Sequence, residues 1–203
     1  SEENIMINIA IFGFGVVGSG TAEVLTQNAE LIARRVGDII NIKYILDLRD
    51  FPGSPFADKI VHDIDVIIND PEVKICAELM GGLHPAFEFS ERAMRAGKSV
   101  VTSNKEIVAN LGPELLKIAA ENNVRYLFEA SVGGGIPVIN PIGNCLTAND
   151  ITEIDGILNG TTNYILSRMI TANADFDTAL AEAMDKGYAE RNPSADVEGH
   201  DAC

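Results

Sequence analysis

Basic residues are scarce in this sequence. Its 203 residues include 15 Lys and Arg against 30 Asp and Glu, which gives a formal net charge of −15 at pH 7. A charge of this sign repels phosphate backbones and anionic lipid surfaces at long range. We therefore expect neither nucleic acid nor a membrane as a partner, and any bound phosphate must be held by local backbone N–H groups.

Cysteines and long apolar runs are also few. Cys76, Cys145 and Cys203 are odd in number, lie far apart and lack Cys-x-x-Cys or Cys/His spacing, which is typical of reduced thiols in the cytoplasm. No apolar run approaches the roughly 20 residues of a membrane span, and the acidic start at Ser1 to Asn4 lacks a cationic leader. With 46% hydrophobic and 22% charged residues, the composition indicates a folded, soluble, cytoplasmic protein.

Short apolar runs alternate with amphipathic segments over the first two thirds of the chain. The nearly continuous hydrophobicity of 6–12 indicates a strand of a parallel sheet that is covered on both faces. The alternation predicts an α/β fold with a doubly wound parallel sheet. The predicted strands cover 6–12, 40–46, 74–80, 99–102 and 124–128, and the predicted helices cover 16–36, 85–96 and 106–122. The segment 63–69 is open between helix and strand, and Gly112-Pro113 is a possible break in the third helix.

A glycine turn, Gly13-Phe-Gly-Val-Val-Gly18, directly follows the first strand and opens the first helix. Its first glycine permits the tight turn, the second lets a pyrophosphate approach the backbone, and the third allows close packing of helix on strand. Free N–H groups at the helix start then hold phosphates even in an acidic protein. The turn predicts a Rossmann-like, dinucleotide-binding domain, with a turn that has no ligand as the alternative. The predicted contacts are Gly13, Phe14, Gly15, Val16, Val17 and Gly18.

Asp47 and Arg49, which follow the second strand, bear on the choice of cofactor. Asp47 would bond a ribose diol and exclude a 2′-phosphate, whereas Arg49 could pair with that phosphate. Either could instead be a solvated loop charge. The prediction is therefore NAD(P), with both forms left open.

The pattern changes beyond Pro137, where a strand over 151–158 and helices over 161–171 and 176–186 are predicted. We place a dinucleotide-binding domain at 1–138 and a partial α+β domain at 139–203. At roughly 60 residues the second domain is short for an independent core.

Four blocks together resemble homoserine dehydrogenase in identity, order and spacing. They are the glycine turn, Glu129-Ala-Ser-Val-Gly-Gly-Gly-Ile-Pro137, Ile157-Leu-Asn-Gly-Thr-Thr-Asn-Tyr164 and the segment from Gly187 to Ala202. The resemblance implies reversible NAD(P)-dependent reduction of L-aspartate 4-semialdehyde to L-homoserine, in the biosynthesis of threonine and methionine. It also implies that the second domain binds the amino-acid substrate and forms a homodimer in the intact enzyme.

Further site residues follow from the same resemblance. Val100-Val-Thr-Ser-Asn-Lys105 resembles the family's V-V-T-A-N-K block, which implies that Thr102 and Ser103 lie near the nicotinamide and that Lys105 reaches into the active site. An exposed lysine is the alternative for Lys105. The carbonyls implied as ligands of a monovalent cation, sodium, are those of Glu129, Val132, Gly134 and Ile136. A glycine hinge between domains is the other interpretation of this segment, and both can hold.

The substrate residues implied by the family are Gly160, Thr161, Glu190, Asp196 and Asp201. Glu190 would receive the α-ammonium of the substrate, and Asp196 and Asp201 would orient the substrate and the catalytic lysine. Thr161 or Thr162 could equally cap a helix, and the acidic residues could be a solvated face.

The family pattern D-x-E-G-x-D-A-x-x-K places a catalytic lysine two residues after Cys203. We therefore expect these 203 residues to bind the cofactor with little or no turnover. Two alternatives remain: a non-catalytic nucleotide-binding module, and another semialdehyde oxidoreductase that would need a nucleophilic cysteine with a histidine partner. Cys76 and Cys145 lack recognisable flanking motifs for that chemistry.

Overall fold

The computed structural model describes residues 6–157, 159–189 and 198–199. The chain divides into two compact units, Ser1–Thr147 and Ala148–Cys203, and each is described by itself. The predicted boundary at 138/139 remains a prediction.

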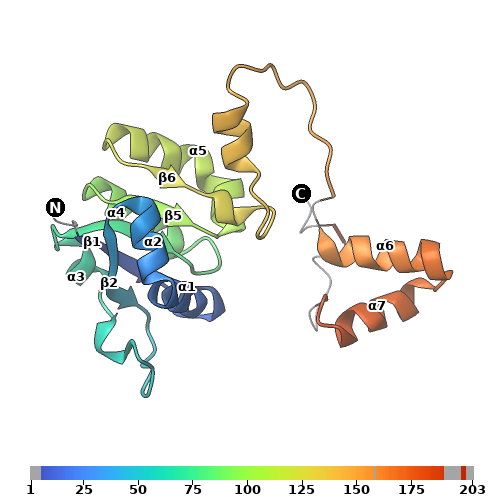
Figure 1. Ribbon diagram of the computed structural model, residues 1–203, viewed down its shortest axis with the longest axis horizontal. Helices are drawn as coiled ribbons and strands as arrows, with labels where there is room; N and C mark the ends of the chain where they lie inside the picture. Colours follow the sequence, from blue (N-terminus) through green and yellow to red (C-terminus); the bar gives the residue numbers. More distant parts are fainter. Residues whose placement is uncertain (1–5, 158, 190–197, 200–203) are drawn as a thin grey trace. The chain divides into compact units, whose positions relative to one another are not determined.

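The first unit is built on a six-stranded parallel sheet with the strand order β3-β2-β1-β4-β5-β6 (Figure 1). This confirms the predicted α/β fold with a Rossmann-like, doubly wound sheet. The strands are β1 (Met6–Phe12), β2 (Ile39–Leu46), β3 (Ile60–Val61), β4 (Val73–Glu78), β5 (Ser99–Thr102) and β6 (Tyr126–Leu127).

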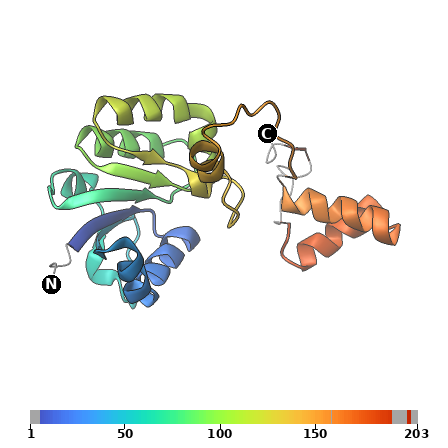
Figure 2. The ribbon, with the colours of Figure 1, turned by 45° about the horizontal axis from the view of Figure 1, so that its top comes forward.

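Helices cover both faces of this sheet (Figure 2). On β1, Ile9 and Ile11 face a core that includes Ala22 of α1, whereas Ala10 and Phe12 face the larger core beneath α3, α4 and α5. Because both faces are buried, the strand is apolar at almost every position rather than at alternate ones. The helices are α1 (Val16–Gln27), α2 (Ala29–Val36), α3 (Ile64–Ile68), α4 (Ala86–Arg95) and α5 (Lys105–Glu121), with short turns η1 (Ala57–Lys59), η2 (Glu129–Ser131) and η3 (Pro141–Cys145).

Some local expectations need correction. The single helix predicted over 16–36 is two helices that meet at Asn28, which has φ −104° and ψ 17°. Asparagine competes with the helical backbone for hydrogen bonds, which favours such a junction. The ambiguous segment 63–69 contains α3, capped by the Asp63 side chain. Helix α5 continues through Pro113 without a break, and β3 was not predicted because two residues are too few to show a period.

The second unit contains the helices α6 (Gly160–Ala172) and α7 (Phe176–Asp185), which pack on each other. Their shared core includes Ile165, Ala179 and Ala183, and Arg168 pairs with Glu182 at 2.7 Å. The strand predicted over 151–158 is wrong for the described part, since 151–157 form no strand. A strand needs a partner for its backbone groups, and the described residues of this unit provide none.

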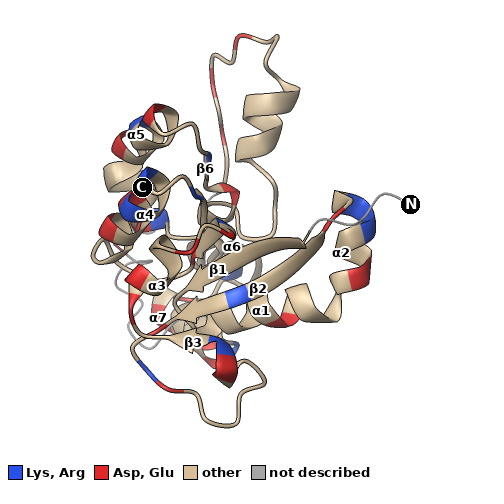
Figure 3. Cartoon of the chain, turned by 90° about the vertical axis from the view of Figure 1, so that its left-hand side faces the viewer, with Lys and Arg blue, Asp and Glu red and all other residues tan. Residues whose placement is uncertain are grey.

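Acidic and basic side chains are mixed on the helices of the first unit, as α2 and α4 illustrate (Figure 3). Among the residues described, no helix is both long and apolar enough to cross a bilayer.

Candidate functional site

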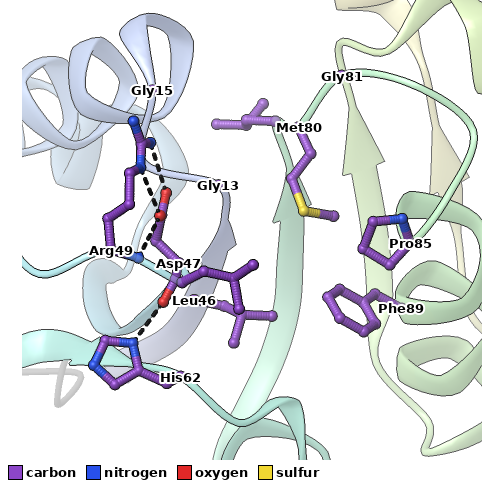
Figure 4. Close-up of a pocket in the computed structure, with 12 residues that line it drawn as sticks. Gly13, Gly15, Leu46, Asp47, Arg49, His62, Met80, Gly81, Pro85 and Phe89 are labelled. Carbon is purple, nitrogen blue, oxygen red and sulfur yellow. Dashed lines mark hydrogen bonds and ion pairs between the residues drawn. The ribbon is translucent and has the colours of Figure 1, made fainter.

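A cavity of about 520 Å³ lies at the carboxyl ends of the strands, where the strand order reverses between β1 and β4 (Figure 4). Open α/β sheets bind their ligands at such a switch point. Its walls come from the turn after β1, the loop after β2, the residue after β3, the segment after β4 and the start of α4. The lining residues are Gly13, Gly15, Leu46, Asp47, Leu48, Arg49, His62, Leu79, Met80, Gly81, Pro85 and Phe89.

The glycine turn forms one rim of this cavity. Gly13 has φ +90°, a conformation that L side chains rarely adopt. A Cβ on Gly18 would stand 2.0 Å from the Gly13 carbonyl oxygen, so only glycine allows α1 to pack this closely on β1. Gly15 is different, because a Cβ there would meet nothing within 4 Å. The space beside Gly15 is therefore open for a ligand.

The amino end of α1 lies at the same rim. The first N–H groups of an α-helix have no partner within the helix, and no side chain caps this 12-residue helix. Val16 at the first position is 91% exposed. Free donors and the helix dipole together suit a phosphate group, which is the interaction predicted from the glycine turn.

Asp47 connects the loop after β2 to the glycine turn. One of its oxygens, Oδ2, accepts a hydrogen bond from the main-chain N–H of Phe14 at 2.8 Å. Its carboxylate also receives the Arg49 guanidinium through Nε and Nη2, each at 3.0 Å, and the Arg49 main-chain N–H at 3.0 Å. These bonds, the Arg49 side chain first, lower the pKa of Asp47 to about 2. Asp47 is therefore a fixed negative charge in the cavity wall.

Arg49 completes this arrangement from the outside. Its guanidinium lies 5.0 Å from the centre of the Phe51 ring, a distance suited to a cation–π contact. Phe51 packs edge-on against Phe14 at 5.0 Å. Asp47 and Arg49 are predicted from the sequence as alternative residues for selecting the cofactor. In the structure they form an ion pair, and both line one cavity.

His62, immediately after β3, lines the cavity and was not predicted. Its Nδ1 lies 2.7 Å from the carbonyl oxygen of Asp47, and its Nε2 lies 3.1 Å from Oδ1 of Asp50. The only sequence feature that could have indicated this position is a single histidine directly after two apolar residues, Ile60 and Val61.

The opposite wall is apolar. Met80 and Gly81 follow β4, and Pro85 and Phe89 come from the start of α4 (Figure 4). Hydrophobic walls with a few polar groups are typical of sites for planar ring systems. None of these residues carried a recognisable motif in the sequence.

A buried polar network lies beside this wall. Glu78, the last residue of β4, is fully buried and accepts hydrogen bonds from the Thr102 hydroxyl at 2.5 Å and the Met80 N–H at 2.8 Å. Burial raises the pKa of Glu78. The Thr102 oxygen in turn accepts the Asn104 N–H at 2.9 Å. Thr102 thus uses its hydroxyl to hold the ends of β4 and β5 together.

The same network sets the start of α5. The Asn104 side chain caps this helix by accepting the Ile107 N–H at 3.2 Å, and Lys105 is the first residue of the helix. The Ser103 N–H donates to the Glu78 carbonyl oxygen at 3.3 Å, which joins main-chain atoms at the ends of β5 and β4. The predicted nicotinamide residues Thr102 and Ser103 and the predicted active-site Lys105 therefore lie on one rigid corner of the sheet.

The segment from Glu129 is held by its own side chain. The Glu129 carboxylate accepts main-chain N–H groups of Val138, Ile139 and Asn140 at 2.5, 3.1 and 2.6 Å, and these bonds lower its pKa. Gly133 and Gly134 have positive φ angles of 74° and 58°.

The predicted carbonyl ligands of Glu129, Val132, Gly134 and Ile136 remain a prediction. Within the described ranges, no cluster of three or more His, Cys, Asp or Glu could hold a metal. Carbonyl oxygens are hard ligands, so the predicted donors suit a monovalent cation chemically.

In the second unit, Gly160 and Thr161 begin α6. The Thr161 hydroxyl donates to the Tyr188 carbonyl at 2.5 Å. The helix cap is neither Thr161 nor Thr162 but Asn159, whose Oδ1 accepts the Thr162 N–H at 2.7 Å. The remaining predicted substrate residues, Glu190, Asp196 and Asp201, lie outside the described residues.

Two family models match this chain. Residues 13–129 match the family model described as homoserine dehydrogenase, NAD binding domain, and residues 137–203 match the model described as homoserine dehydrogenase. The chain is 43% identical over 199 residues to homoserine dehydrogenase of Synechocystis sp., which covers 97% of this chain and 46% of that protein.

Solved structures give the same result. A homoserine dehydrogenase from Thiobacillus denitrificans aligns with a TM-score of 0.89 and 42% identity over 98% of this chain and 46% of that one. A hyperthermophilic archaeal homoserine dehydrogenase, solved in complex with NADPH, aligns with a TM-score of 0.81 and 32% identity over 98% of this chain and 66% of that one. The chain spans about half the length of the curated relatives it matches.

Proposed function

Because the chain belongs to the homoserine dehydrogenase family, we propose that its first unit binds NAD or NADP for the reversible reduction of L-aspartate 4-semialdehyde to L-homoserine. The observation that carries this proposal is the cavity at the switch point, where the open Gly15 and the uncapped amino end of α1 meet the fixed carboxylate of Asp47. The family model named for NAD binding and the archaeal relative with NADPH support it.

Different residues of the cavity bind different parts of the cofactor. The first N–H groups of α1 hold the pyrophosphate, and the apolar wall of Met80, Pro85 and Phe89 takes the adenine. Asp47 and Arg49 receive the adenosine ribose or its 2′-phosphate. The dinucleotide therefore fits the residues that are present.

The reacting end lies at the corner formed by β4 and β5. When bound, the nicotinamide supplies or accepts the hydride. Thr102 and Ser103 would position the ring, and Lys105 is proposed to stabilise the developing alkoxide. Glu78 acts indirectly, since it holds Thr102 in place.

The amino-acid substrate is bound by the second unit. Gly160 and Thr161 contact it, Glu190 receives its α-ammonium, and Asp196 and Asp201 orient it. A monovalent cation, sodium, is held by the carbonyls of the segment from Glu129. In the intact enzyme this unit also forms the homodimer, and the enzyme works in the cytoplasm.

A cysteine-dependent oxidoreductase is a poorer candidate. Cys76 is fully buried, and burial raises the pKa of its thiol to about 12, so the thiolate needed for nucleophilic catalysis is not formed. If alkylation of the accessible thiols abolished dehydrogenase activity, this ranking would be reversed.

The direct test is titration of the 203-residue chain with NAD and NADP by calorimetry. Gly15→Val is expected to weaken both at least tenfold, because the new side chain enters the space through which the pyrophosphate approaches. Gly20→Val is the matched control, since Gly20 lies in the helix that Gly15 precedes and its Cβ also meets nothing within 4 Å. Absence of binding by the unsubstituted chain would refute the proposal.

Catalysis needs its own measurement. Homoserine-dependent reduction of NAD or NADP is measured with these 203 residues and with the chain extended to the length of its relatives. We expect turnover from the longer chain and little or none from the shorter. Failure of the longer chain to oxidise homoserine would leave a nucleotide-binding module without this activity.

A further inference from the structure

His62 lies between two hydrogen-bond acceptors. The Asp47 carbonyl oxygen, 2.7 Å from Nδ1, can only accept a hydrogen bond. The Asp50 carboxylate, 3.1 Å from Nε2, can also only accept. A neutral imidazole has one N–H and so satisfies one of these acceptors, whereas the imidazolium satisfies both. The arrangement therefore selects the charged ring.

The protonation of His62 determines the net charge of this part of the cavity rim. The loop after β2 presents Asp47, Arg49 and Asp50, of which Asp47 and Arg49 neutralise each other. Asp63, next in the chain, is turned to the start of α3, where it caps the Asp65 N–H. With neutral His62 this rim has one net negative charge from Asp50, and with the imidazolium it has none.

The same rim receives the adenosine ribose in the proposed function. His62, Asp47 and Arg49 all line the one cavity (Figure 4), and the His62 side chain is 52% exposed. A ribose diol carries no charge, so it is insensitive to the charge on this rim. A 2′-phosphate is an anion that a net negative rim repels and an imidazolium attracts.

We propose that His62 is a specificity-determining residue, whose protonated ring favours NADP over NAD and whose neutral ring removes that preference. This rests on the proposed dinucleotide site. The hydrogen bond to the Asp47 carbonyl, followed by the attraction of Asp50, raises the pKa of His62 above its ordinary value. The change in preference is therefore expected at a pH above the usual pKa of histidine.

The test is calorimetric titration of the 203-residue chain with NAD and with NADP between pH 6 and pH 9 at constant ionic strength. The measured quantity is the ratio of the dissociation constant for NAD to that for NADP. We expect this ratio to rise on the order of tenfold from pH 9 to pH 6, the size of a charge–charge attraction that solvent partly screens. The 2′-phosphate itself gains a proton near pH 6, which opposes the expected trend and so cannot imitate it.

Three variants of the chain test whether the pH dependence comes from His62. His62→Asn removes the titration, so its ratio is expected to stay flat or fall as pH decreases. His62→Lys carries a charge at every pH used, so its ratio is expected to be high and flat. Asp50→Asn, a position that does not line the cavity, is expected to shift the rise to lower pH because the imidazolium loses its carboxylate. Circular dichroism verifies that each variant is folded.

His84→Gln is the matched control. His84 also pairs with a carboxylate, that of Glu88 at 2.6 Å, and does not line the cavity. It is expected to keep the pH dependence of the unsubstituted chain. An equal pH dependence in His62→Asn would overturn the inference while leaving dinucleotide binding intact. Absence of binding by both cofactors would instead overturn the proposed function, and the inference with it.

Discussion

The Asp47 carboxylate accepts the main-chain N–H of Phe14 at 2.8 Å. This bond joins residues 33 positions apart and ties the end of β2 to the glycine turn after β1. A residue predicted only to select the cofactor therefore also fixes the glycine turn. Substitutions at Asp47 are expected to alter the fold as well as recognition.

Asp47→Asn is expected to change stability in acid. The pKa of Asp47 in the folded protein is about 2, below the unfolded value of about 3.9. Its contribution to stability is therefore full above about pH 4 and is lost as the pH falls towards 2. We expect the variant to be less stable by about 1–2 kcal/mol at pH 7 and by less at pH 3. Urea unfolding of both proteins at the two pH values measures this, and an unchanged difference would contradict it.

Gly18→Ala is expected to destabilise the first unit by about 2–4 kcal/mol. The new Cβ would stand 2.0 Å from the Gly13 carbonyl oxygen, so α1 must move away from β1. Gly20→Ala is the control, because its Cβ enters open space and alanine is the better helix former. Thermal unfolding followed by circular dichroism compares the two variants, and equal melting temperatures would show that the close approach is not needed.

Thr102→Val is expected to cost about 1–3 kcal/mol at pH 7, since it removes a donor from a buried carboxylate. The raised pKa of Glu78 means that the folded state binds this proton more tightly than the unfolded chain does. The contribution of Glu78 to stability is therefore greatest at low pH and falls as the pH rises through its unfolded and folded pKa values. The cost of Thr102→Val should be smaller at pH 4 than at pH 7. Urea unfolding at both pH values tests this, with a larger cost at pH 4 as the contrary result.

Asn159→Ala is expected to destabilise α6 by about 0.5–2 kcal/mol, because its side chain caps the helix through the Thr162 N–H. Asn163→Ala is the matched control at an exposed position of the same helix, where alanine should be neutral or stabilising. Hydrogen exchange of the amides in the first turn of α6 measures the effect. Equal exchange in both variants would mean that the cap contributes nothing.

Much of the first unit could be predicted from sequence because its signals are local. The apolar run of β1 and the glycines after it indicate both the buried strand and the turn. Residues that act through distant partners were harder to predict. In the sequence, Glu78 is an ordinary charged residue at the end of a strand. Its burial and its hydrogen bond with Thr102 are visible only in the folded structure.

The errors have similar causes. His62 follows a two-residue strand that has no detectable period, and 151–157 have strand-like residues without a partner strand in the described structure. Asp47 and Arg49 follow β2 as predicted, but their mutual pairing depends on side-chain geometry. Sequence can indicate which residues reach a strand end and cannot indicate which of them bond to one another.

β3 is one of the two edge strands of the sheet, and His62 follows it, whereas the glycine turn follows the central β1. In the proposed function, selection between the two coenzymes therefore depends on a residue at the border of the sheet, whereas the diphosphate is received at its centre.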